Sequence, residues 1–205
     1  MRVLPDDQPW VFDLISPDDA VRAAARRRNQ AVIAGASEAL RRYNKVWTRP
    51  DFVPLAHAFV RETERTLKGL VSAFCSAEDP QVRARYAPYA VLYLQWEERY
   101  PAELTESWMW SIWTAKEVVL RNLHRQGVPP ELGPEIADLI VAALHRPYRC
   151  KDWRYASLLH QVAPVERIVT IDDDRARFAL HVVRNPAVNV TRATYPRWLA
   201  AQPAR

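Results

Sequence analysis

One stretch of eleven residues combines positive charge with aromatic rings. It runs from His145 to Tyr155, reads HRPYRCKDWRY, and contains five basic or potentially basic side chains and three aromatic ones. Arginine and lysine neutralise phosphates and aromatic rings stack on bases, so this composition is typical of a nucleic-acid contact surface. The same composition would suit a tight bend between two helices, with the rings over the core and the arginines in solvent. The candidate contact residues are Arg146, Arg149, Lys151, Trp153 and Arg154.

A second group of basic residues lies on the first expected helix. Arg22 and Arg26 are the candidate phosphate contacts there, and Arg27, Arg28 and Arg41 follow them along the chain. These side chains spread over a broad polar face, and a run of charges on a helix is usually a solvated surface. The sequence therefore leaves open both a second phosphate-binding patch and an ordinary exposed face.

One arginine of the basic stretch and a histidine that follows it have a spacing that could support catalysis. Arg154 and His160 match the Arg-to-His spacing that metal-independent helical ribonucleases of the HEPN type use. In such a site the arginine would stabilise phosphate charge and the histidine would act as an acid or a base. Composition alone predicts about as many matches as the chain contains, Arg175 with His181 being the other. Metal-independent ribonuclease activity is therefore the minor alternative, and a non-enzymatic role is favoured.

Cofactor and metal chemistry have little support in the sequence. The chain has four glycines, and no two of them have the spacing of a phosphate-binding loop or a dinucleotide-binding turn. His145, Cys150 and His160 could supply three metal ligands, but each is more often a structural side chain. The Asp172–Asp174 run suits a turn as well as a cation. We therefore predict no metal site and no cofactor.

Charge and cysteine content indicate the setting of the protein and the kind of partner. The net charge is +5, the pI is about 9.4, and all but four of the 29 basic residues are arginine. A basic balance favours a polyanion, DNA or RNA, and less often another protein. No secretory pattern, membrane-length apolar run or Cys-x-x-Cys pair is present. We expect a cytoplasmic protein with no membrane partner.

Apolar periodicity and helix-start residues predict about six helices. The first opens with Ser16 as its cap and runs to about Val46. The segment before it is expected to be an extended arm. The fourth helix carries Trp108, Trp110 and Trp113 around its circumference, which predicts a central, buried helix. The other expected helices are one that opens at 48–51 and continues to about 74, one at 80–100 with a kink or break at Pro88, the fourth itself at 103–125, and two more at 134–144 and 151–162.

The last third of the chain changes from a helical period to an alternating one. Three strands are predicted, at 167–171, 177–183 and 188–192. The expected fold class is mainly α, with about six helices in one compact, bundle-like domain and a small C-terminal three-stranded antiparallel β meander, α+β by strict count. Residues 1–126 would form the N-terminal helical bundle, and residues 127–205 two short helices and the meander, packed as part of the same domain.

These elements leave two further functional alternatives. Three helices followed by two strands is the order of a winged helix, in which Lys151 and Arg154 would lie on the recognition helix. The protein could also be a helical protein–protein adaptor or a subunit of a homo-oligomer. It would then use the Trp-rich fourth helix or the edge of the sheet. The favoured hypothesis remains a non-enzymatic nucleic-acid-associated protein.

Overall fold

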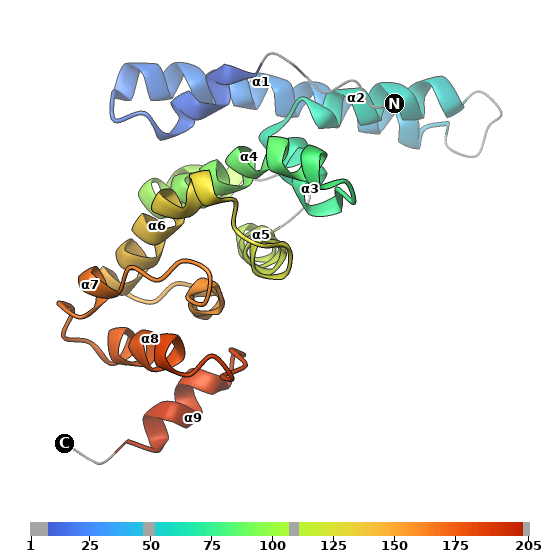
Figure 1. Ribbon diagram of the computed structural model, residues 1–205. Helices are drawn as coiled ribbons and strands as arrows, with labels where there is room; N and C mark the ends of the chain where they lie inside the picture. The colour runs from blue at the N-terminus through green and yellow to red at the C-terminus, as the bar shows by residue number, and fades with distance from the viewer. Residues whose placement is uncertain (1–7, 47–51, 107–110, 203–205) are drawn as a thin grey trace. The chain divides into compact units, whose positions relative to one another are not determined.

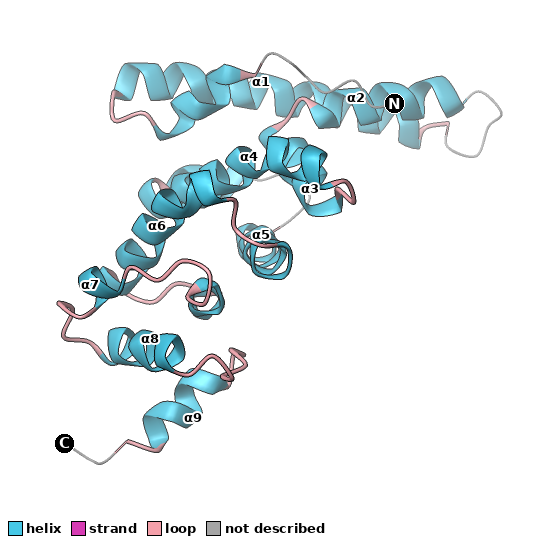
Figure 2. Cartoon of the chain, in the orientation of Figure 1, coloured by secondary structure: helices cyan, strands magenta, loops and turns pink. Residues whose placement is uncertain are grey.

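The computed structural model describes residues 8–46, 52–106 and 111–202, and in these ranges the chain is helical with no strand. Figure 2 shows helices joined by loops throughout the described parts. The chain divides into two compact units, residues 1–108 and residues 109–205. The helix expected to close the N-terminal bundle, at 103–125, therefore contributes its main part to the second unit.

The first unit is built around a helical hairpin and a second helix pair. Helices α1 and α2 run side by side in opposite directions, and α3 packs on α4 (Figure 1). The elements are η1 (Pro9–Ile15), α1 (Asp19–Asn44), α2 (Phe52–Glu64), α3 (Leu67–Ser76), α4 (Pro80–Arg99) and η2 (Pro101–Glu106), where η marks a 3₁₀ helix. The core is made by the apolar faces of α3, α4 and η1, chiefly Leu70, Val71, Phe74, Ala90, Leu92, Leu94, Val11 and Leu14.

Short polar residues start two of these helices, as expected from the sequence. The Asp18 carboxylate accepts hydrogen bonds from the backbone N–H groups of Ala20 and Val21, and Asp79 accepts one from Gln81. Each satisfies backbone donors that the first helical turn leaves unpaired. The cap of the first helix is therefore Asp18 and not Ser16. Residues 48–51, expected to start the second helix, lie outside the described residues.

A sharp junction at Thr66 divides the expected second helix into α2 and α3. The Thr66 hydroxyl donates to the Thr63 carbonyl at 2.7 Å and accepts from the Gly69 N–H at 2.9 Å. A side chain at Gly69 would place its Cβ 2.0 Å from the Thr63 carbonyl oxygen. The two helix ends can therefore approach this closely only because residue 69 has no side chain.

The second unit consists of shorter helices and longer connections. Helix α5 packs against η4, and α8 packs against α7 and α9. The elements are α5 (Ile112–Gln126), η3 (Pro130–Leu132), α6 (Gly133–His145), η4 (Asp152–Leu158), α7 (Val165–Ile168), α8 (Asp174–Arg184) and α9 (Thr194–Ala200). The core residues are Val119, Leu120, Leu123, Ile136, Ile140, Leu158, Leu159, Ile168 and Val182.

The predicted C-terminal β meander is wrong. The second predicted strand, 177–183, falls in α8. Of the first, residues 167–168 end α7 and residues 169–171 form a turn and a loop, and residues 188–192 lie between α8 and α9 without regular structure. Alternation of Phe178, Leu180 and Val182 suggested a strand, but Leu180 is only partly buried. The buried residues are Ala176, Phe178, Ala179 and Val182, which lie on one face of a helix. Asp173, expected in a turn, caps α8 by accepting from the Arg175 N–H. The winged-helix alternative is therefore wrong as well, because the wing of that fold is formed by the predicted strands.

Three other expectations about local structure also need correction. The described part of the expected extended arm is the 3₁₀ helix η1. The predicted helix at 151–162 is the shorter 3₁₀ helix η4, entered through Lys151 in a left-handed conformation. Pro88 lies inside the single helix α4, so the predicted break there is wrong, whereas the alternative of a kink stays a prediction. The expected number of about six helices is too low, since the described residues form nine α-helices and four 3₁₀ helices.

The helix expected to be buried on all sides is amphipathic where it is described. Trp108 and Trp110 lie outside the described residues. In α5, Trp113 is exposed while Val119 and Leu120 are fully buried. No helix in the described ranges combines the length and the hydropathy needed to cross a membrane.

Candidate nucleic-acid interface

The basic bend between α6 and η4 is organised around one buried carboxylate. Asp152 accepts hydrogen bonds from Lys116 Nζ at 2.7 Å, from Arg146 Nη1 at 2.6 Å and from the Arg149 backbone N–H at 2.5 Å. The Lys116 side chain is fully buried, and that of Arg146 is only 12% exposed. Of the predicted contact residues, Arg146 therefore presents little of its guanidinium to solvent, and the bend is held by internal ion pairs.

The surroundings of Asp152 favour its ionised form. Burial by itself would raise the pKa of this carboxyl group, but the hydrogen bonds from Arg146 and Lys116 and the charge of Lys116 outweigh burial and lower the pKa. A buried lysine and a buried carboxylate are each costly alone, so the charged pair is stable only as a unit.

A second carboxylate, Glu117 on α5, forms ion pairs with two of the other predicted contact residues. Its Oε2 lies 2.5 Å from Lys151 Nζ, and its Oε1 lies 3.1 Å from Arg154 Nη2. The hydrogen bond from Lys151, followed by that from Arg154, lowers the pKa of Glu117 against the opposing effect of burial. The Arg154 guanidinium also lies over the Trp153 ring, 4.2 Å from its centroid. Lys151, Trp153 and Arg154 are thus brought together on one side of α5.

Two further arginines lie on the solvent-facing arc of α5. Arg121 and Arg125 are one turn apart and exposed, and Trp113 lies on the same arc. Among the described residues, neither arginine has a carboxylate at ion-pair distance, although Arg125 donates to the Asn122 side chain at 3.1 Å. We define the α5–η4 face as Trp113, Glu117, Arg121, Arg125, Lys151, Trp153 and Arg154. It carries four cations, two indole rings and one carboxylate.

The net charge of the protein is divided unevenly between the two units. Residues 109–205 contain 14 Lys and Arg and nine Asp and Glu, a net charge of +5, whereas residues 1–108 contain 15 of each and are neutral. All of the excess positive charge therefore belongs to the unit that contains the α5–η4 face.

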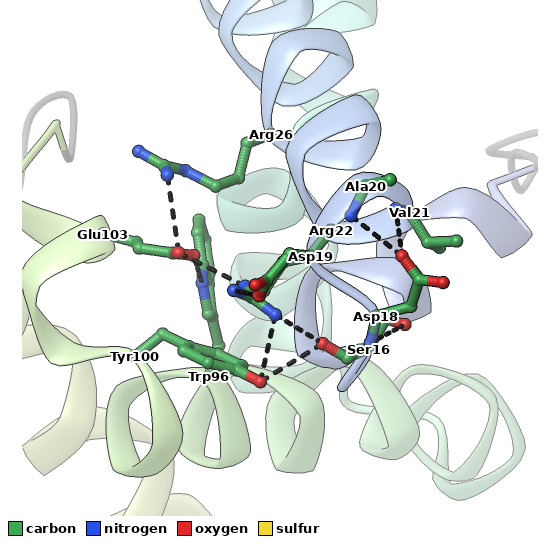
Figure 3. Close-up of polar contacts among 10 residues, drawn as sticks. All are labelled: Ser16, Asp18, Asp19, Ala20, Val21, Arg22, Arg26, Trp96, Tyr100 and Glu103. Atoms are coloured by element: carbon green, nitrogen blue, oxygen red, sulfur yellow. Dashed lines mark hydrogen bonds and ion pairs between the residues drawn. The ribbon is translucent and has the colours of Figure 1, made fainter.

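The other two predicted contact residues, Arg22 and Arg26, belong to the neutral unit and share an acid (Figure 3). Glu103 Oε1 accepts from Arg22 Nε at 3.3 Å and from Arg26 Nη1 at 3.4 Å, while Oε2 accepts from Trp96 Nε1 at 3.1 Å. Arg22 also donates to the Ser16 carbonyl at 2.8 Å, and its side chain is 13% exposed. These two arginines therefore join α1 to α4 and η2.

The residues of the other possible sites are not brought together. Arg154 points to Glu117 and Trp153, His160 is exposed, and no contact joins Arg154 to His160 in the described parts of the chain. No three His, Cys, Asp or Glu side chains within the described ranges are close enough to hold a metal ion.

Sequence reasoning missed the contribution of α5. Lys116, Glu117, Arg121 and Arg125 occupy that helix, which the tryptophans just before it had suggested was apolar on all sides. The one-turn spacing of Arg121 and Arg125 was the available signal for an exposed basic stripe.

Comparisons with known proteins identify no relative. No protein-family model matches the chain, and neither a curated protein nor a solved structure shows significant similarity to it.

Proposed function

We propose that the protein binds nucleic acid without transforming it, through the α5–η4 face. The observation that carries the proposal is the charge division, with +5 on residues 109–205 and zero on residues 1–108. Phosphate neutralisation with release of counterions supplies most of the affinity of such proteins. A cytoplasmic setting, where RNA and, in cells without a nucleus, DNA are both present, suits this function.

The arrangement of the face supports phosphate and base contacts together. Arg121 and Arg125 are separated by one helical turn, a spacing at which two guanidinium groups can contact neighbouring phosphates on one strand. Trp113 is 36% exposed and offers a ring on which an unpaired base can stack. Glu117 orients Lys151 and Arg154 but neutralises only one of their two charges.

The first test is fluorescence anisotropy with labelled duplex DNA and labelled single-stranded RNA. Affinity is expected to fall steeply, by at least about tenfold, between about 50 and 200 mM salt, because each neutralised phosphate releases a counterion. Absence of binding at the lower salt concentration, where attraction is strongest, would exclude the proposal. RNA recovered intact after incubation with a metal chelator would argue against the ribonuclease alternative, whereas cleavage that His160→Ala abolishes would support it.

The double variant Arg121→Gln/Arg125→Gln is expected to weaken binding by about tenfold or more. It should also reduce the slope of log affinity against log salt by about two, one for each lost phosphate contact. The matched control is Arg41→Gln/Arg42→Gln, which removes the same charge from exposed residues of α1 that pair with Glu38. Equal losses in the two double variants would mean that binding follows net charge and that the α5–η4 face is not the site.

A further inference from the structure

A partly enclosed pocket lies within residues 1–108, between α1, α3, α4 and η2. Its cavity volume is about 60 Å³, room for several waters or a small organic group. Its apolar walls come from four elements and are formed by Ile33, Leu67, Trp96 and Leu104. An apolar pocket of this kind with a few convergent polar groups is the usual form of a small-molecule site.

Two cations lie in the wall of this pocket. Lys68 at the start of α3 is half-buried, and Arg26 approaches from α1. The Glu103 carboxylate beside them already accepts from Arg22, Arg26 and Trp96 (Figure 3). Arg22 lies outside the pocket lining and also pairs with Asp19. Among the residues that line the pocket, Arg26 and Lys68 are cations and Glu103 is the carboxylate, so the lining carries a net positive charge.

A buried amide in the same wall is incompletely hydrogen-bonded. Asn29 lies one turn along α1 from Arg26 and is 7% exposed. Its Oδ1 has no hydrogen-bond donor among the described residues. Buried polar atoms are nearly always paired in folded proteins, so an unpaired acceptor in a pocket wall indicates a missing water or ligand donor.

We propose that this pocket binds a small organic anion, with an apolar ring or short chain against Trp96 and Leu67 and a carboxylate facing Lys68 and Arg26. A hydrogen-bond donor on the ligand, or a water held by it, would pair with Asn29. The site is separate from the α5–η4 face and does not depend on nucleic-acid binding. The pocket size limits the ligand to about one ring or a short aliphatic chain.

The charge of Lys68 gives the binding a characteristic pH dependence. Burial lowers the pKa of Lys68 to about 8, so its ammonium group is lost at mildly alkaline pH. The other titratable groups in the wall are Arg26, Glu103 and Tyr93; burial and the nearby Glu97 raise the pKa of Tyr93, which keeps its phenol neutral. Binding of the anion should therefore weaken as pH rises through about 8.

The test uses the full-length chain and two fluorinated probes that differ in charge. 4-Fluorobenzoate and 4-fluorobenzamide have the same ring, and fluorine NMR relaxation measures how much of each is bound. We expect the benzoate to bind about three- to fivefold more tightly at pH 7, the effect of a partly solvated ion pair. This preference should become smaller at pH 9.5, where Lys68 has lost its charge.

Variants identify the cations responsible. Lys68→Met and Arg26→Gln should each reduce the preference for benzoate, and Lys68→Met should also remove its pH dependence. Lys45→Met makes the same chemical change at an exposed position of the same unit and should have no effect. Equal binding of the two probes to the unaltered protein would refute the proposal, as would a preference that survives both variants.

A second measurement requires no substitution. The chain has only four lysines, at 45, 68, 116 and 151, so acetylation of each can be followed by mass spectrometry. Excess 4-fluorobenzoate should slow acetylation of Lys68 and leave that of exposed Lys45 unchanged. Equal effects on both lysines would mean that the benzoate does not occupy the pocket.

Discussion

Replacing Asp152 with alanine is expected to destabilise residues 109–205 by about 3–5 kcal/mol, the usual cost of leaving a buried charge without its partner. The charge left behind is the ammonium group of Lys116, which is fully buried and 2.7 Å from the carboxylate it would lose. Arg146 and the Arg149 N–H would lose the same acceptor. The contacts between α5, the end of α6 and η4 would weaken together.

Hydrogen exchange followed by mass spectrometry is the appropriate measurement, because it reports on each unit separately. Protection should fall in α5 and η4 and remain in α3 and α4. The control is Asp138→Ala, which removes an exposed carboxylate paired with exposed Arg167 and should change stability by no more than about 0.5 kcal/mol. If Asp152→Ala costs no more than this control, the ion pair does not hold the unit together.

A second substitution separates the effect of the buried Lys116 charge from the effect of the hydrogen bonds that Asp152 no longer accepts. Adding Lys116→Met to Asp152→Ala should recover part of the lost stability, since an apolar side chain then occupies the buried position. If the double variant is less stable than Asp152→Ala, Lys116 contributes through packing and not as a partner of Asp152.

The stabilising effect of Asp152 should also depend on pH. Its pKa is lowered in the folded state, so its contribution is fully present above the pKa of the unfolded chain, near 4. The contribution is lost as pH falls through the lower, folded value. The stability difference between the unaltered protein and Asp152→Asn, measured by urea unfolding, should therefore be constant near neutral pH and shrink below about pH 4. A difference that grows in acid would contradict this assignment.

The substitution Gly69→Ala is expected to destabilise residues 1–108 by about 3 kcal/mol or more, at or above the upper end of overpacking effects. The new Cβ would lie 2.0 Å from the Thr63 carbonyl oxygen and 2.8 Å from the Glu64 Cα, both backbone atoms. Neither can move without separating α2 from α3. Alanine ordinarily stabilises a helix relative to glycine by up to about 1 kcal/mol, so the expected loss is opposite in sign to helix propensity.

The matched control for this substitution is Gly133→Ala. Gly133 has helical backbone angles, φ −55° and ψ −47°, and an added Cβ would have no heavy atom within 4 Å apart from its chain neighbours and its own helix backbone. This variant should be neutral or stabilise by up to about 1 kcal/mol in urea or thermal unfolding. If both variants behave alike, the close approach of α2 and α3 at Thr66 is not present in solution.

Local signals in the sequence determined where several helices begin and end. Asp18 and Asp79 start α1 and α4 because a short acidic side chain reaches the unpaired N–H groups of the first turn. Gly127 ends α5 with φ +92°, a conformation that costs glycine little. These helix starts and this helix end depend on residues within a few positions of one another in the sequence. The same local signals predict a mainly helical chain.

Other features depended on contacts between distant residues. Residues 174–184 fit both an alternating and a helical pattern, and the choice was made by burial of Ala176 and Ala179 beside Phe178 and Val182. The basic bend was evident in the sequence, but its pairing with Lys116 and Glu117 joins residues more than 30 positions apart. The pocket beside Lys68 likewise needs four separate elements. Periodicity and capping report on interactions within one helix, whereas the pairing of charges and the closing of a pocket depend on which helix faces pack together, and only the tertiary structure decides that.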